Sequence, residues 1–266
     1  MSIVVFDSGV GGLTVLNELV TAAPYEDFIY LADEKFCPYG NRDDEFITDR
    51  LSKICDYIKR LNPRAVVIAC NTASRFKNVF KKKLSVPVFD VITPTVNYVG
   101  AFYKGEKVLL LATKSTVNGG VYQKALKRKN IYCKAVACEF FVPYIENLLT
   151  HSEEFSIRLT ETFSSVDFDA FAAVIYGCTH FGLIDDKIKN FLNKNCQTFS
   201  CGLPAALLVK ESLFFRSTED FSGKFCKVKY FTTASAETFF KKLNYYLNRL
   251  PNLAIQNLSC NDIYII

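Results

Sequence analysis

Two cysteines occupy matching positions in the two halves of the chain. Cys70 and Cys178 follow short apolar runs, residues 65–69 and 173–177, which are typical of buried parallel strands. Small polar residues that cap helices come next in both places. Ligands of open α/β sheets bind beyond the carboxyl ends of the strands. We therefore expect each thiol at a ligand crevice near a helix N-terminus, where the pKa of a cysteine falls. Together they predict a pair of acid/base groups flanking one substrate carbon.

Packing is the alternative role for any single cysteine, because cysteine is among the most buried residue types. Cys55 is expected to be such a core residue, since it shares the apolar face of an amphipathic helix with Ile47, Leu51 and Ile58. The other cysteines lack the repeated context of Cys70 and Cys178: Cys37, Cys133, Cys138, Cys196, Cys201, Cys226 and Cys260.

Length and composition indicate a globular protein with one large or two modest domains, because half of the 266 residues are apolar. The chain enters a strand at its first residues without a signal peptide, and no apolar run approaches the ~20 residues of a membrane helix. These features predict a cytoplasmic protein with mostly reduced thiols. Two histidines and the lack of a C-x-x-C motif argue against a structural metal site.

The formal net charge of +5 is a weak signal. The basic stretches at 81–83 and 124–134 are interpreted as solvated helix faces, because no nucleic-acid-binding motif is interleaved with them. We expect neither nucleic acid nor membrane as a partner. A mild field that attracts a carboxylate substrate is compatible with this charge.

Strands and helices alternate along the chain, which predicts an α/β fold with parallel sheets. Strands are expected at 3–6, 28–31, 65–69, 88–90 and 108–112, and helices at 13–22, 44–61, 73–83 and 236–250. Ser235 is the expected N-cap of the last helix. The Cys178 strand repeats the Cys70 strand, which suggests a duplicated unit of about a hundred residues. The crevice between two packed halves is then the natural site.

A glycine-rich turn at residues 7–12 (DSGVGG) follows the first strand. It lacks the Gly-Lys-Ser/Thr ending of a Walker loop, and Thr14 replaces the third glycine of a dinucleotide fingerprint. The turn could instead bring backbone amides to an anion. Asp7 could bind a substrate ammonium, tune a thiol or cap the helix.

Polar residues beside the two thiols extend the candidate site. Asn71, Thr72 and Thr179 can donate to a carboxylate or cap helices. His180, two residues after Cys178, is suited to acid/base chemistry or to tuning that thiol. His151 is expected at the surface.

The chain resembles the cofactor-independent aspartate/glutamate racemase family over nearly its whole length. The motifs that carry the resemblance are residues 5–13 (VFDSGVGGL), 38–40 (PYG), 69–73 (ACNTA), 111–113 (LAT), 141–146 (FVPYIE) and 177–180 (GCTH). Three segments depart from the family pattern: Glu139 in place of a proline, Phe181-Gly182 in place of Tyr-Pro, and Ser200-Cys201-Gly202 in place of Asp-Ser-Gly. We expect these to alter loop geometry and domain contacts rather than the thiols or the anion-binding positions.

The resemblance implies racemisation of L-glutamate to D-glutamate for peptidoglycan synthesis, without a cofactor or metal, in a homodimer. It implies two similar α/β domains, residues 1–96 with 207–266 and residues 97–206, with the active site between them. Cys70 and Cys178 would be the catalytic bases, Asp7 and His180 would assist them, and Glu146 would lie nearby. The residues implied in substrate binding are Asp7, Ser8, Tyr39, Gly40, Asn71, Thr72, Thr179 and His180.

Three other functions remain open from the residues themselves. The same scaffold could racemise another small amino acid such as aspartate, or could bind an amino acid without turnover. A cysteine hydrolase using Cys178 and His180 is a third candidate. It is disfavoured because i,i+2 neighbours rarely aim at one atom, and because Cys70 would have no role.

Overall fold

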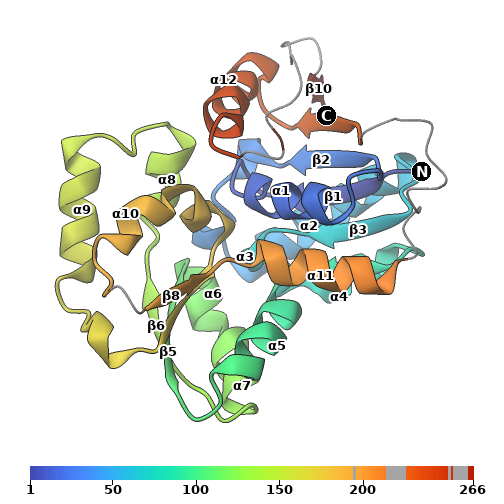
Figure 1. The fold of residues 1–266 in the computed structure, drawn as a ribbon. Coiled ribbons are helices and arrows are strands. Elements are labelled where there is room, and N and C mark those ends of the chain that lie inside the picture. Colours follow the sequence, from blue (N-terminus) through green and yellow to red (C-terminus); the bar gives the residue numbers. More distant parts are fainter. Residues whose placement is uncertain (194–195, 214–225, 251–252, 254–262) are drawn as a thin grey trace.

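Two parallel sheets form the framework of the computed structural model, which describes residues 1–193, 196–213, 226–250, 253 and 263–266 (Figure 1). The six-stranded sheet has the order β10-β9-β2-β1-β3-β4, and the four-stranded sheet has the order β6-β5-β7-β8. Their bounds are β1 Ile3–Asp7, β2 Phe28–Ala32, β3 Ala65–Ile68, β4 Val88–Asp90, β5 Lys107–Ala112, β6 Tyr132–Ala137, β7 Ala173–Gly177, β8 Gln197–Phe199, β9 Val228–Thr232 and β10 Ile263–Ile265. The predicted α/β class with parallel sheets is confirmed.

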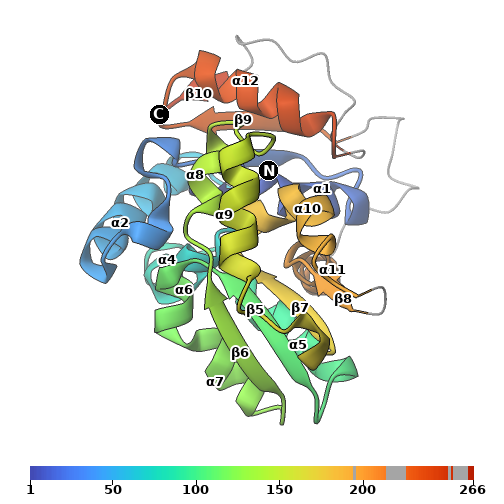
Figure 2. The same ribbon diagram turned by 90° about the vertical axis from the view of Figure 1, so that its left-hand side faces the viewer.

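Helices flank these sheets (Figures 1 and 2). The α-helices are α1 Leu13–Ala22, α2 Asp44–Arg60, α3 Asn71–Ser74, α4 Lys77–Lys83, α5 Ile92–Phe102, α6 Lys114–Gly119, α7 Val121–Lys127, α8 Phe141–Glu146, α9 Glu153–Phe163, α10 Asp185–Lys189, α11 Gly202–Ser212 and α12 Ala236–Leu247. The 3₁₀ helices are η1 Glu34–Phe36, η2 Tyr39–Asn41, η3 Phe168–Ala170 and η4 Thr179–Ile184. No helix in the described ranges is both long enough and apolar enough to cross a membrane.

The two sheets repeat one arrangement. In both halves the strand order across the sheet is second, first, third, fourth. It is β2-β1-β3-β4 in the first half and β6-β5-β7-β8 in the second. Cys70 follows β3 and Cys178 follows β7, so the two thiols come from equivalent strands. The predicted domain boundaries at 96/97 and 206/207 fall inside helices α5 and α11. The division of the chain into two domains at these positions stays a prediction.

The buried strands place apolar side chains on both faces of their sheets, because helices cover both faces of a parallel sheet. Val5 of β1 belongs to the same apolar cluster as Leu109 of β5, so one core runs through both halves. Phe6 faces a second cluster under α2, where Cys55 is fully buried as predicted. Cys260, one of the cysteines without the repeated context, lies outside the described residues.

Local structure differs from the sequence prediction at two helices. The helix predicted at 73–83 begins earlier, at Asn71, and is divided into α3 and α4 because Phe76 leaves helical geometry, with φ −104° and ψ 23°. The last helix ends at Leu247 instead of residue 250, while its predicted Ser235 cap accepts a hydrogen bond from the Thr238 N–H.

Candidate active site

A narrow cavity lies where the strand ends of the two sheets meet. Its water-accessible volume is about 10 Å³, enough for a single water molecule. Every predicted site residue except Asp7 and Glu146 lines it, together with Pro38, Thr113 and Val142. The predicted residues come from both halves and therefore converge on one space, which must widen before an amino acid can enter.

Cys70 caps helix α3 at one wall of this cavity. Its Sγ accepts the Ala73 N–H (3.5 Å) and lies 3.6 Å from Ser8 Oγ. Burial raises the pKa of Cys70 to about 12, and the charge of Asp7 adds to this effect. The expected lowering of this pKa by a helix N-terminus was wrong, because one amide from a four-residue helix does not offset desolvation.

Cys178 lies at the end of β7, where a 3₁₀ helix follows instead of the expected α-helix. Its side chain caps no backbone amide. Its polar neighbour is His180, whose Nδ1 is 3.8 Å from the sulfur. The two residues of this i,i+2 pair are therefore in contact, as a cysteine hydrolase would require. The placement of Cys70 in the same cavity remains as the argument against it.

Asp7, the last residue of β1, is fully buried behind the cavity wall. It accepts the Gly9 N–H (2.9 Å) and the Thr179 hydroxyl (3.1 Å). Burial raises the pKa of Asp7 to about 6, although His180 and both hydrogen bonds oppose the rise. Its charge can therefore change close to neutral pH.

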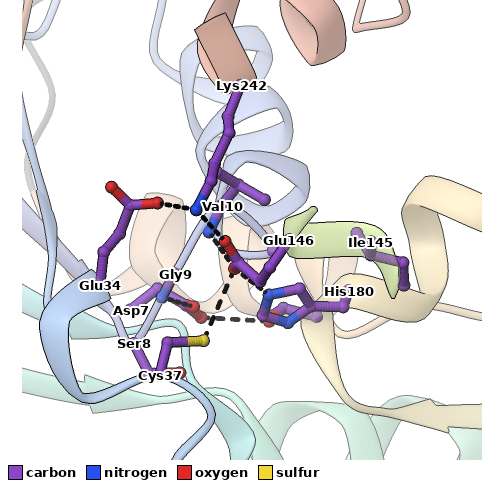
Figure 3. A network of polar contacts seen from close by, with 12 residues as sticks. Asp7, Ser8, Gly9, Val10, Glu34, Cys37, Ile145, Glu146, His180 and Lys242 are labelled. Carbon is purple, nitrogen blue, oxygen red and sulfur yellow. Dashed lines mark hydrogen bonds and ion pairs between the residues drawn. The ribbon is translucent and has the colours of Figure 1, made fainter. Parts of the chain in front are cut away.

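Glu146 and His180 form a buried hydrogen-bonded pair (Figure 3). Glu146 Oε1 lies 2.6 Å from His180 Nε2 and accepts the Val10 N–H (2.9 Å). Burial opposes ionisation of both groups. Hydrogen bonds with Cys178, Cys37 and Glu146 nevertheless raise the pKa of His180, and contacts with His180 and Lys242 lower the pKa of Glu146 to about 2.

Three residues that the sequence interpretation left out complete this network. Lys242 of α12 contacts Glu146 Oε2 (2.8 Å) and Glu34 Oε1 (2.6 Å), and the Cys37 thiol lies 3.6 Å from Glu146 Oε1. Cys37 directly precedes the 38–40 motif, a position that could have identified it. Glu34 and Lys242 are 208 residues apart and carry no local signal.

The donor atoms of Cys37, Glu146 and His180 lie within 4.8 Å of one another, a spacing that metal ligands adopt. Glu146 already accepts from Val10 and Lys242, however, and the Lys242 ammonium would repel a cation. The electrostatics among these described residues favour proton exchange over metal binding.

The remaining polar residues of the wall hold one another in place. The Tyr39 hydroxyl donates to Asp33 (2.5 Å), and the Thr72 hydroxyl lies 3.1 Å from that of Thr113. A Cβ on Gly40 would come within 2.6 Å of Thr113, so the two halves approach closely at this glycine.

Asn71 accepts the Tyr122 hydroxyl (2.6 Å) and donates to Cys201 Sγ (3.5 Å). The Ser200-Cys201 departure therefore does reach a predicted substrate-binding residue, contrary to expectation. Phe181, in the second departure, is buried against Phe141 with ring centroids 5.5 Å apart. His151 is exposed, as predicted.

Known proteins share both this sequence and this fold. The Asp/Glu/hydantoin racemase family model matches residues 6–197. Glutamate racemase 2 of Caldanaerobacter subterraneus subsp. tengcongensis is 36% identical over 242 residues, which cover 88% of this chain and 89% of that protein.

Two crystal structures are similar over their whole length. A glutamate racemase isoform from Bacillus anthracis has a TM-score of 0.86 at 25% identity, covering 100% of this chain and 97% of that chain. The glutamate racemase from Francisella tularensis subsp. tularensis, in complex with D-glutamate, has a TM-score of 0.83 at 26% identity with the same coverage.

Proposed function

This chain belongs to the Asp/Glu/hydantoin racemase family, and from that premise we propose that it interconverts L- and D-glutamate without a cofactor. The observation that carries the proposal is the convergence of Cys70 and Cys178, from equivalent strands, on one cavity. Glutamate is the proposed substrate because the similar proteins reported above are named glutamate racemases.

The proposed reaction is proton exchange at the α-carbon. One thiolate removes the α-proton, so that the C–H bond breaks and an S–H bond forms. The carbanion then takes a proton from the second thiol on its opposite face, which leaves that sulfur as the thiolate. Each turnover inverts the carbon and exchanges the roles of the thiols, so the reverse reaction uses the same groups.

The α-proton of an amino acid is a very weak acid, and fixed geometry must lower the barrier. Donors aimed at the substrate carboxylate would stabilise the negative charge that develops during proton removal. We assign this role to Ser8, Asn71, Thr72 and Thr179, with Tyr39 and Gly40 completing the binding wall. Exclusion of water from the narrow cavity would strengthen these interactions.

We propose that Asp7 and His180 control the protonation states of the two thiols. A substrate ammonium near Asp7 would add positive charge to the cavity and thereby favour a thiolate at Cys70. His180 can exchange a proton with Cys178 across their 3.8 Å contact, while Glu146 holds the opposite ring nitrogen.

Circular dichroism of L-glutamate and D-glutamate solutions tests the proposal. The enzyme is first dialysed against a chelator and treated with borohydride, which would reduce a pyridoxal Schiff base. The treated enzyme should still bring either solution to zero optical activity. L-Aspartate should change far more slowly. Faster turnover of aspartate would identify the alternative racemase, and binding of glutamate without turnover would identify a binding protein.

The cellular role and assembly belong to the same proposal. The reaction would supply D-glutamate for bacterial peptidoglycan, which complementation of a D-glutamate auxotroph would test. A homodimer is proposed, and sedimentation of the purified chain should give twice the mass of 30.1 kDa.

A further inference from the structure

Lys242 links the C-terminal helix α12 to the cavity. Its ammonium lies 2.6 Å from Glu34 Oε1 and 2.8 Å from Glu146 Oε2, and its side chain is only 15% exposed (Figure 3). Both carboxylates are more deeply buried, with side-chain exposures of 2% and 9%. A cation shielded between two carboxylates has a defined position, unlike a surface ion pair.

The contacts of Glu146 divide between its two oxygens. Oε1 faces His180 and the Val10 N–H, and Oε2 faces Lys242. His180 in turn contacts Cys178 through its other ring nitrogen. A continuous chain of polar contacts therefore runs from Lys242 through Glu146 and His180 to a thiol of the cavity.

We propose that Lys242 is a positioning residue for racemisation, which holds Glu146 in place so that His180 can support proton transfer at Cys178. The inference rests on the proposed function and extends it to α12. Lys242 does not line the cavity, so its effect must pass through Glu146.

Charge balance explains why a cation is needed at this point. Without Lys242, Glu34 and Glu146 would share a buried region with no positive group between them, and one would turn away or take up a proton. Either change would disturb the 2.6 Å contact between Glu146 and His180. Glu34 also accepts the Thr232 hydroxyl (3.0 Å) at the end of β9, which fixes the other side of the lysine.

The test compares Lys242→Met and Lys242→Arg with Lys241→Met. Lys241 precedes Lys242 on α12, but it is 68% exposed and pairs with Glu237, so it is the matched control. We expect Lys242→Met to lower kcat/KM about ten- to a hundredfold, because it removes a hydrogen bond to a charged group. Lys242→Arg should recover part of the loss, and Lys241→Met should match the wild type.

A kinetic isotope effect distinguishes a positioning role of Lys242 from a loss of folded enzyme. The substrate for this test is α-deuterated glutamate. If Lys242→Met slows proton transfer at Cys178, breaking the C–D bond limits the rate more strongly in the direction where Cys178 removes the deuteron. The isotope effect on kcat/KM should therefore rise in that direction. The effect should fall in the opposite direction, where Cys70 removes it. Partly unfolded enzyme would lose activity without this opposite movement, so equal isotope effects in wild type and Lys242→Met would overturn the proposal.

Charge imbalance alone could unfold Lys242→Met, and the double variant Glu34→Gln/Lys242→Met removes that imbalance. A folded double variant should stay impaired and keep the opposed isotope effects, because Glu146 Oε2 still lacks its 2.8 Å contact with the Lys242 ammonium. Full recovery of activity would contradict the positioning role. Inactive wild-type enzyme would instead contradict the proposed function, so the two failures are distinguishable.

Discussion

Cys70 and Cys178 have different polar surroundings, although equivalent strands present them. Cys70 lies beside Ser8 and within the field of Asp7, whereas Cys178 contacts His180 and, through it, Glu146. Sequence reasoning could predict both thiols and their immediate neighbours, because each lies within a few residues of a strand end. It could not predict Lys242 or Glu34, because only folding brings α12 beside η1.

The first prediction concerns the thiols themselves. Cys70→Ala and Cys178→Ala should each lower kcat/KM by about 10² to 10⁴-fold, the usual contribution of a general acid or base. The double variant should be little worse than either single variant, because each turnover needs both groups. Cys55→Ala, on the buried face of α2, is the control for loss of a buried thiol. A single variant that kept most of its activity would refute the two-thiol assignment.

A second prediction follows from the pKa of Asp7, which burial raises from 3.8 to about 6. A carboxyl group with a raised folded-state pKa stabilises the fold below its unfolded pKa and loses that contribution as pH rises through 6. As the pH rises from 4 to 7, Asp7→Asn should therefore gain stability relative to wild type by roughly 2 kcal/mol.

Urea unfolding followed by far-ultraviolet circular dichroism at both pH values measures this difference. Asp49→Asn, which removes a carboxylate that is 66% exposed on α2, should show a much smaller change. A constant difference between Asp7→Asn and wild type across the range would contradict the raised pKa. Glu146 affects the free energy of unfolding in the opposite sense. Because its pKa is lowered to about 2, the ionised carboxylate stabilises the fold, and this stabilisation is lost as the pH falls towards 2.

At the scale of elements, helices and strands with a strong apolar pattern were predictable, and those without one were not. Helix α1 and strand β4 have the predicted bounds, and α2 differs only at its last residue. Strands β8 and β10 have three residues each, too few to show a period, and they were missed. The 3₁₀ helix after Cys178 also lacks a sequence signal that distinguishes it from an α-helix.

The turn between β1 and α1 supplies the third prediction. A Cβ on Gly11 would lie 2.4 Å from His180 Nδ1 and 2.5 Å from Thr179 Oγ1, so Gly11→Ala must displace site residues from the second half. We expect kcat/KM to fall about a hundredfold, as a misplacement of about 1 Å can cause. In Gly100→Ala the three atoms nearest to the new methyl all belong to the flexible Lys129 side chain, and activity should persist. Equal activity of the two variants would contradict the close approach.

The whole molecule combines a duplicated architecture with a shared core and a narrow central cavity. Each half contributes one thiol, and a water-accessible volume of about 10 Å³ leaves no room for glutamate until the walls separate. Opening would admit the substrate, and closing would exclude water around the reacting carbon. The sequence could indicate the duplication through its repeated strand–Cys pattern. The width of the cavity depends on contacts such as Gly40 with Thr113, which no local pattern encodes.

The central claim is that the two halves provide separate bases on opposite faces of one carbon. Proton NMR in deuterated water, at low conversion of L-glutamate, tests it most directly. The delivering thiol carries solvent deuterium, so the first D-glutamate formed should be labelled at the α-carbon while the remaining L-glutamate stays largely unlabelled. Starting from D-glutamate should give the mirror result. Early D-glutamate without label, or equal labelling of both enantiomers, would contradict the two-base account.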